Sequence, residues 1–356
     1  MKRTTSLLMA VIIIITAISI VSCDTGSVKL EYRIDKVSET VTITGQGSAK
    51  GKWVTIPEEI DGYPVTAIGE YAFKDSTFEQ IILPTTITSI GRGAFYNCKK
   101  LFALHNLEKC IGLEKIEREV FYGCEYFIDL NLPESIKEIG DYAFYKCTYL
   151  YRFSLPSRLE SIGDYAFYAC LNLSPSIPDS VTHIGECAFL GCYSISQVVI
   201  PSRVTRIENW SFSQCANLEE IAIPEGVNFI GEYAFYLCEA LDSVNIPSTV
   251  LTIGVAAFAD CKMLKQVTVP EGVRRIDVAA FANTSNLKSI YLPKSLQFLG
   301  DKVFLNNMML IDIYYAGTVD EWNAISKGDA WNEATANYTI HCADGDISKD
   351  GAVTYK

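Results

Sequence analysis

The sequence is poor in the residue types on which most catalytic and nucleic-acid-binding sites depend. Its 356 residues include only three histidines, His105, His183 and His341, and each lies in a different part of the chain. It contains 30 Lys and Arg against 42 Asp and Glu, giving a net charge of -12, and it has no basic run. Because phosphate contacts need clustered Lys and Arg, this balance disfavours nucleic-acid binding. Nucleophile elbows, phosphate loops and metal motifs are also missing, so the sequence predicts a protein that is not an enzyme and uses no cofactor.

Long hydrophobic runs are scarce as well, and the clearest one lies at the N-terminus. Lys2 and Arg3 give a basic start, and the apolar run from Leu7 to Val21 is shorter than the ~20 residues of a membrane-spanning helix. This layout is typical of a signal peptide, and the small residue before Cys23 makes it resemble a bacterial lipobox. We therefore predict that residues 1–22 are removed and that Cys23 becomes a lipidated N-terminus. The protein would then lie in the cell envelope, surface-exposed or in the outer membrane. An uncleaved anchor helix and an ordinary secretory signal are the alternatives.

What the sequence has in abundance is an internal repeat of about 23 residues. Phenylalanines follow one another at steps of 23, with one step of 22, from Phe121 to Phe304, and Phe73 and Phe95 extend the series upstream. Eight prolines keep the same spacing: Pro133, Pro156, Pro178, Pro201, Pro224, Pro247, Pro270 and Pro293. A period near 23 lies in the range of leucine-rich repeats, where stacked units share one continuous core.

The repeat unit can be interpreted physically from residues 241–261. "LDSVNIP" alternates apolar and polar residues, which indicates a short strand with one buried face, and Pro247 ends that strand. Val250 and Ile253 supply a second apolar pair for the opposite wall of the coil. Gly254 is interpreted as the residue that permits a sharp corner, and "AAFADC" places small and large apolar side chains inside.

The consensus, close to "LxxIxIPxxVxxIGxxAFxxC", resembles the BspA-like, or treponemal-type, leucine-rich-repeat family over about residues 47–315. The resemblance implies a β-rich solenoid of stacked ~23-residue units with parallel β-strands, displayed at a cell surface and used in adhesion and protein binding. It implies no catalytic residues. At ~4.8 Å per unit, eleven units would span roughly 50 Å.

Departures from the repeat predict caps and irregular units. Residues 23–46 are expected to contain the lipidated N-terminus and a β-hairpin cap, residues 47–313 the solenoid, residues 314–342 a C-terminal cap with a helical turn, and residues 343–356 a polar tail. The unit between Phe95 and Phe121 carries an insertion, and "LSPSIP" at residues 173–178 is one residue short with an extra Pro175. For each of these two irregular units, sequence drift and a recognition feature are the alternative explanations.

The tail leaves two interpretations open. Asp346, Ser348, Asp350 and Gly351 match the first positions of an EF-type calcium loop and resemble the start of a dockerin module, but the acid expected at position 12 is missing. The alternative is a polar, unstructured terminus.

The cysteines suggest a disulfide framework at first, but their positions argue against one. Eight occupy the same place in successive units, three residues after Phe: Cys98, Cys124, Cys147, Cys170, Cys192, Cys215, Cys238 and Cys261. Stacked side chains point in parallel, which keeps the Cβ atoms farther apart than the usual ~3.8 Å of a disulfide. Thr284 and Asn307 fill the same place, so we predict a ladder of reduced, buried thiols. Cys187 falls at an outward position and is predicted to be a reactive thiol.

Two rows of outward residues are candidate binding surfaces. Tyr142, Tyr165, Trp210 and Tyr233 stand two residues before the phenylalanine and form one row, beside further tyrosines one residue after it. Tyr291 and Tyr314 lie on the strands, between inward residues. Tyrosine offers a large, rigid contact area with a polar tip, which suits binding. The rings could instead simply pack against one another along the edge of the solenoid.

The sequence thus predicts a non-enzymatic bacterial surface protein that binds macromolecular partners, for example a host extracellular matrix protein. A structural surface protein without a specific ligand and a carbohydrate binder acting through the tyrosines are the alternatives.

Overall fold

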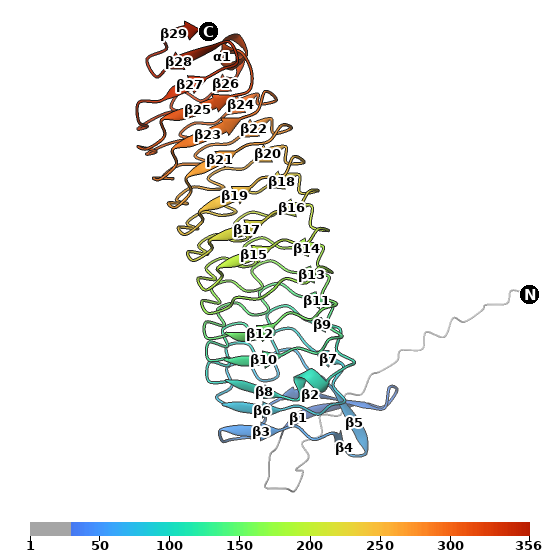
Figure 1. The fold of residues 1–356 in the computed structure, drawn as a ribbon. Helices are drawn as coiled ribbons and strands as arrows, with labels where there is room; N and C mark the ends of the chain where they lie inside the picture. The colour runs from blue at the N-terminus through green and yellow to red at the C-terminus, as the bar shows by residue number, and fades with distance from the viewer. Residues whose placement is uncertain (1–29) are drawn as a thin grey trace, which may run out of the picture.

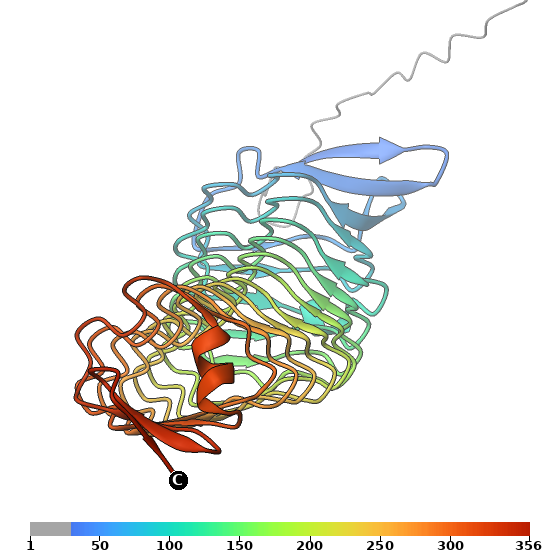
Figure 2. The ribbon, with the colours of Figure 1, turned by 90° about the horizontal axis from the view of Figure 1, so that it is seen from above.

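The computed structural model describes residues 30–356, and it is an elongated β-solenoid in which each turn of the chain, here called a coil, stacks on the one before it (Figures 1 and 2). Strands of neighbouring coils pair in parallel and in register, as in β15, β17 and β19. The predicted leucine-rich-repeat solenoid, with an N-terminal hairpin and a C-terminal cap, is therefore confirmed. The predicted signal peptide (residues 1–22) and Cys23 lie outside the described residues.

The first wall consists of short strands formed by the "IxIP" part of each unit, and alternate side chains point into the core. Its strands are β3 (Trp53–Thr55), β6 (Gln80–Ile82), β8 (Ala103–His105), β10 (Asp129–Asn131), β12 (Arg152–Ser154), β15 (Gln197–Val199), β17 (Glu220–Ala222), β19 (Ser243–Asn245), β21 (Gln266–Thr268), β23 (Ser289–Leu292), β25 (Asp312–Tyr315) and β27 (Thr339–His341). The wall is interrupted after β12, because the short segment with Pro175 forms no strand and β12 and β15 do not pair.

The second wall consists of two-residue strands from the "IG" part of each unit. They are β7 (Ser89–Ile90), β9 (Lys115–Ile116), β11 (Glu138–Ile139), β13 (Ser161–Ile162), β14 (His183–Ile184), β16 (Arg206–Ile207), β18 (Phe229–Ile230), β20 (Thr252–Ile253), β22 (Arg275–Ile276), β24 (Phe298–Leu299) and β26 (Ser326–Lys327). The insertion between β8 and β9 forms a 3₁₀ turn, η1 (Leu107–Lys109), which buries Leu107 and Cys110 against the core.

The glycine that follows most of these strands, for example Gly254 after β20, is needed for a reason other than the predicted corner. Gly254 does not adopt a left-handed conformation. A Cβ atom there would instead lie 2.7 Å from the backbone carbon of Gly231 and 2.8 Å from the nitrogen of Glu232. Glycine therefore permits the close approach of two coils. The interpretation of Gly254 as a conformational corner was wrong.

The third side of each coil is a pair of tight turns that contain two residues with positive φ. One stands two residues before the phenylalanine and the other two residues after it, and most are not glycine. The phenylalanines between them are fully buried and stack ring on ring through all eleven coils, with centroids 5.1 to 6.3 Å apart. This ring column is the centre of the core.

The cysteine ladder lies beside the ring column. The eleven cysteines of the described chain are free and buried, so the predicted ladder of reduced thiols is confirmed. Each of the eight repeated thiols donates to the phenylalanine carbonyl of the preceding coil, for example Cys170 to Phe144 O (3.0 Å) and Cys192 to Phe167 O (3.2 Å). The Asn307 amide makes the same bond to Phe281 O (2.9 Å). The place therefore requires a small donor, which explains why cysteine suits it.

Both ends of the solenoid are covered. At the N-terminus, β1 (Glu31–Asp35) and β2 (Thr40–Gly45) form a hairpin, and β2 pairs in parallel with β5 (Tyr63–Ile68), next to β4 (Glu59–Ile60). At the C-terminus, α1 (Val319–Ala324) begins with a Thr318–Glu321 capping box and buries Trp322.

The last residues continue the C-terminal cap. β28 (Gly345–Ser348) pairs with β27, and β29 (Val353–Tyr355) pairs with β28, so the first wall ends in an antiparallel hairpin. Asp346 of this hairpin lies beside His341 and Lys356. The alternative of an unstructured tail was wrong, because the backbone bonds of residues 345–355 are made within the sheet.

Candidate binding surfaces

The first predicted row, Tyr142, Tyr165, Trp210 and Tyr233, lies on the turn side of the solenoid. All four residues adopt the left-handed conformation, with φ between 54° and 58°. A non-glycine residue in this conformation costs about 1–2 kcal/mol. The fold therefore holds these aromatic residues in a backbone geometry that disfavours them.

The rings of this row stack in two pairs rather than as one continuous stripe. Tyr142 and Tyr165 have centroids 4.8 Å apart and are parallel within 2°. Trp210 and Tyr233 lie 4.0 Å apart at 10°. Cys187 occupies the same position in the coil between the two pairs, so the structure does not bring all four rings together.

Next to this row, the tyrosines one residue after the phenylalanine form a longer stack. Tyr96, Tyr122, Tyr145 and Tyr168 follow one another at centroid distances of 4.6 Å. Each inner ring has a neighbour on both faces, and all four side chains are half-buried. Only the ring edges and hydroxyl groups remain available to a partner.

The environment of Cys187 does not fit the predicted role of a reactive thiol. It is 4 % exposed, and burial raises the pKa of its thiol to about 11 despite the neighbouring Tyr165 side chain. A thiol with such a pKa is protonated at neutral pH, and the thiolate is the reactive form. The prediction of a reactive Cys187 was therefore wrong, because the thiol is buried beside the Tyr165 side chain.

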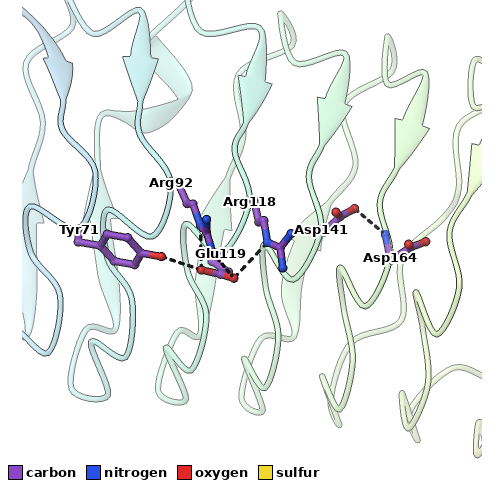
Figure 3. A network of polar contacts seen from close by, with 6 residues as sticks. All are labelled: Tyr71, Arg92, Arg118, Glu119, Asp141 and Asp164. Carbon is purple, nitrogen blue, oxygen red and sulfur yellow. Dashed lines mark hydrogen bonds and ion pairs between the residues drawn. The ribbon is translucent and has the colours of Figure 1, made fainter.

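A polar network replaces the aromatic row near the N-terminus (Figure 3). Glu119 occupies the left-handed position and accepts hydrogen bonds from Tyr71 Oη (3.0 Å), Arg92 Nε (3.2 Å) and Arg118 Nε (3.1 Å). The Arg118 guanidinium also lies 5.3 Å from the ring centroid of Tyr142. Burial raises the pKa of Glu119, but the bonds from Arg92, Tyr71 and Arg118 outweigh it and hold the pKa below its usual value. Glu119 thus joins the coils of Phe73, Phe95 and Phe121 to the start of the tyrosine row.

The acidic residues that follow the glycines also connect coils. Asp141 Oδ1 accepts a hydrogen bond from the backbone N–H of Asp164 (3.1 Å), and Asp164 Oδ1 accepts one from that of Glu186 (2.8 Å). Figure 3 shows the first of these contacts, directly beyond Arg118. Part of the hydrogen-bonding capacity of these carboxylates is therefore taken up by contacts between coils.

The second predicted row lies on the first wall, near the C-terminal end. Tyr291 on β23 and Tyr314 on β25 stack at 4.6 Å, and His341 on β27 continues the stack at 4.8 Å from Tyr314. His341 contacts Asp346 through Nδ1 (3.2 Å) and Asp312 through Nε2 (3.0 Å). The charge of Asp312 raises the pKa of Tyr314.

An open groove of about 650 Å³ runs along this second row. Pro270, Pro293 and Ala316 line it together with the two tyrosines and His341. Sequence patterns indicated Tyr291 and Tyr314 but not His341, because His341 belongs to the cap, where the repeat has ended.

Chemically reactive groups are dispersed over the described residues. His105 is exposed and contacts Gln80, His183 lies on β14 of the second wall, and His341 lies in the cap. Across residues 30–356, His, Cys, Asp and Glu side chains form no group of three that could hold a metal ion. The same residues contain no helix long and apolar enough to span a bilayer.

Sequence reasoning missed a third surface. Phe102, Tyr126, Ile128, Tyr149 and Tyr151 are all exposed large side chains at the corner that leads into the first wall. The signal was present in the sequence, since these residues stand two or four places after the repeated cysteine.

Comparisons with known proteins agree with this architecture. The model of the BspA type leucine rich repeat region matches residues 66–196 and 182–311, with six copies. A leucine rich cell surface protein from Faecalibacterium prausnitzii is 28% identical, with 86% of this chain and 98% of that one covered and a TM-score of 0.51. No curated protein matches.

Two further solved structures share the fold. A leucine-rich repeat protein from Bacteroides ovatus is 23% identical, with 87% of this chain and 98% of that one covered and a TM-score of 0.53. The pneumococcal vaccine antigen PcpA is 21% identical, with 91% of this chain and 98% of that one covered and a TM-score of 0.57. Because the family model matches well over half of the chain, in register with its phenylalanines and prolines, this protein belongs to the BspA-type leucine-rich-repeat family.

Proposed function

We propose that this protein is a non-enzymatic cell-envelope protein that binds extracellular protein partners through the outer faces of its solenoid. The observation that carries the proposal is the placement of aromatic side chains in rows that extend over several coils, outside a core that is the same in every coil. Extended surfaces of this kind are how repeat proteins bind their partners. The solved relative from Faecalibacterium prausnitzii is described as a cell surface protein, which supports the location.

The stacking geometry favours a protein partner over a sugar. A sugar ring that packs on an aromatic side chain needs a free ring face. In the stacks of Tyr142 with Tyr165 and of Tyr291 with Tyr314, neighbouring rings cover the inner faces. Ring edges, hydroxyl groups and the outer faces of the terminal rings remain, and the edges and hydroxyl groups suit the mixed polar and apolar contacts of protein interfaces.

A carbohydrate partner is the second candidate, and the groove beside Tyr291 and Tyr314 is the observation that favours it. The groove combines apolar walls with the polar groups of His341 and Lys356 at one end. A few oriented polar groups on an apolar wall are typical of small-ligand sites.

The binding test compares two variants on the same panel of purified matrix proteins and the same glycan array. The first variant replaces Tyr142, Tyr165, Trp210 and Tyr233 with alanine, which Ala256 and Ala279 show to be compatible with the left-handed position. The second replaces Tyr291 and Tyr314 with serine. Loss of a central aromatic residue is expected to cost about 2 kcal/mol or more of binding free energy.

The outcomes of this test separate the candidate functions. Weaker binding of a protein by either folded variant supports the proposal, and weaker binding of a glycan by the second variant alone supports the carbohydrate alternative. If the parent binds nothing in either panel, the protein is a structural surface component without a specific ligand.

The anchor is a separate part of the proposal. Cys23→Ser is expected to leave an unlipidated form that no longer partitions into detergent, because the lipid would be attached to this thiol. If the variant partitions like the parent, the protein is not a lipoprotein of this type.

A further inference from the structure

The corner patch, defined as Phe102, Tyr126, Ile128, Tyr149 and Tyr151, is a group of exposed, mostly aromatic side chains outside the predicted rows. The exposed fractions of these side chains are 36, 53, 38, 51 and 54%. With about 150–250 Å² for a fully buried aromatic side chain, the patch offers roughly 500 Å² to a partner. Patches of this size on a folded protein are often functional.

The patch residues come from three successive coils, and contacts between side chains and between backbone atoms join two of these coils. Tyr126 and Tyr149 stack at 5.3 Å, and the N–H of Tyr151 donates to the carbonyl of Ile128 (3.3 Å). Phe102, Ile128 and Tyr151 directly precede β8, β10 and β12, which lie in successive coils (Figure 1). Four of the five side chains thus form one surface along the solenoid axis, and Phe102 stands at the same position in the coil before them.

The position directly before the strand carries charged residues in later coils, although Ile311 occupies it in the last one. Asp242 and Lys265 stand where Ile128 and Tyr151 stand in the earlier coils, and they form an ion pair of 2.6 Å. Ala240 and Met263 stand where Tyr126 and Tyr149 stand. The coil geometry therefore accepts charged residues here, and folding does not require the aromatic residues of the patch.

Two cations at the patch have no acidic partner. Among the described residues, Lys100 and Arg152 form no ion pair, and Arg152 instead lies 5.4 Å from the ring centroid of Tyr151. In contrast, Lys99 is paired with Glu125 at 3.0 Å. Arg152 lies in register with Asp129 of the neighbouring strand but forms no ion pair with it. Two cations without an ion pair next to an apolar surface provide charge complementarity for carboxylates that flank an apolar segment.

The size of the patch limits its occupant. A stable interface between two folded proteins needs about 800 Å² on each partner, and the patch falls short of this. A second copy of this chain would moreover bring the same unpaired cations against each other. A short linear segment fits both the area and the charge.

We propose that the corner patch binds a linear peptide segment of a protein partner, in which aromatic or aliphatic residues are flanked by Asp or Glu. This inference rests on the proposed protein-binding function and names the surface and the chemistry of the partner. The apolar residues of the peptide pack on Tyr126, Tyr149 and Tyr151, and its carboxylates meet Lys100 and Arg152.

The test uses a phage-displayed library of random twelve-residue peptides, selected on the purified full chain carrying Cys23→Ser. Enriched peptides are expected to contain apolar residues flanked by Asp or Glu. The triple variant Tyr126→Ser, Tyr149→Ser, Tyr151→Ser is expected to bind them about tenfold or more weakly. The matched control is Leu251→Ser, Met263→Ser, Met308→Ser, which removes equally exposed side chains in later coils and should bind like the parent.

A second variant tests the charges without touching the aromatic residues. Lys100→Glu with Arg152→Glu should weaken the acidic peptides and strengthen versions in which their acids are replaced by lysine. If no peptide is enriched, if the triple variant binds like the parent, or if charge reversal has no effect, the inference is wrong. A concentration-dependent dimer that is lost in the triple variant would also overturn it, because the occupant would then be a second copy.

Failure of this inference can be told apart from failure of the proposed function. A matrix protein that binds the parent and the triple variant equally would refute the corner patch and leave the proposed function intact. Peptides that bind as expected, together with an empty matrix-protein panel, would support the patch and refute the adhesive role.

Discussion

The earlier and later coils of the solenoid have the same interior and different exteriors. Between Phe95 and Phe167, the position after the phenylalanine holds Tyr96, Tyr122, Tyr145 and Tyr168, whereas later coils hold Ala259, Ala282 and Leu305. The residue directly before the first-wall strand is also apolar in the earlier coils, at Phe102, Ile128 and Tyr151. In later coils it is charged, at Asp242 and Lys265. The phenylalanine column nevertheless runs through both regions with similar ring distances. The fold therefore determines the inward residues and leaves the outward ones free to serve binding.

The largest expected effect tests whether the two interiors are equivalent. Phe167→Ala and Phe258→Ala should each destabilise the protein by about 3–5 kcal/mol, because each leaves a cavity in the ring column. Chemical denaturation followed by circular dichroism measures this loss. A difference between the two variants well above about 1 kcal/mol would contradict the equivalence of the interiors.

The next effect concerns the thiol ladder. Cys238→Ala removes the bond to Phe212 O (3.2 Å) and part of the buried volume, and is expected to cost about 1–2 kcal/mol. Thr284→Cys should change stability by less than about 1 kcal/mol, since the threonine already occupies the same position and is satisfied there by a bond to Phe281 O of its own coil. If Cys238→Ala is neutral in denaturation experiments, the ladder bonds contribute nothing to stability.

A smaller effect distinguishes the outer surfaces of the earlier and later coils. It concerns the residue with positive φ two places before the phenylalanine, which is Tyr142 in an earlier coil and Ala279 in a later one. Ala279→Gly should stabilise the protein by about 0.5–1 kcal/mol, because glycine adopts positive φ without a steric cost. Tyr142→Gly relieves the same strain but loses the stack with Tyr165, so it should give no gain. Melting temperatures of both variants measure the effect, and a gain from Tyr142→Gly would mean that the stack is energetically negligible.

The smallest effect lies in the Glu119 network. Because its pKa in the folded protein is below the ordinary value of 4.5, the carboxylate contributes stability above that pH and loses it as the pH falls through the folded value. Glu119→Gln should therefore be less stable than the parent at pH 7, by about 0.5 kcal/mol, and the difference should shrink on acidification below pH 4.5. A difference that is independent of pH between 3 and 7, with ~0.1 M salt throughout, would assign the loss to packing.

The repeat made most of the fold predictable, because its inward residues recur at fixed positions. The solenoid, the two walls and the reduced cysteines followed from the spacing of residues such as Phe167, Pro247 and Cys170. The role of Gly254 was misjudged because the sequence of a single unit does not show how closely the backbone of the preceding coil approaches this residue.

Among the candidate surfaces, sequence placed Tyr142 and Tyr165 correctly in one row but could not foresee that Cys187 would be buried beside the Tyr165 side chain. It also missed the corner patch, since exposure depends on which side chains of adjacent coils reach over a position. Which of these surfaces binds a partner stays a prediction.

The hydrogen bonds that join the coils have a mechanical consequence. They run from coil to coil, as in the bond from Phe144 N to Ala166 O (2.8 Å), and so lie along the length of the molecule. A force that pulls the two ends apart would load the coil interfaces in series, and the weakest end interface would yield first. Each coil that peels away would release roughly 75 Å of chain. A protein tethered at one end and held by a partner at the other would therefore lengthen in steps and absorb work before the attachment breaks.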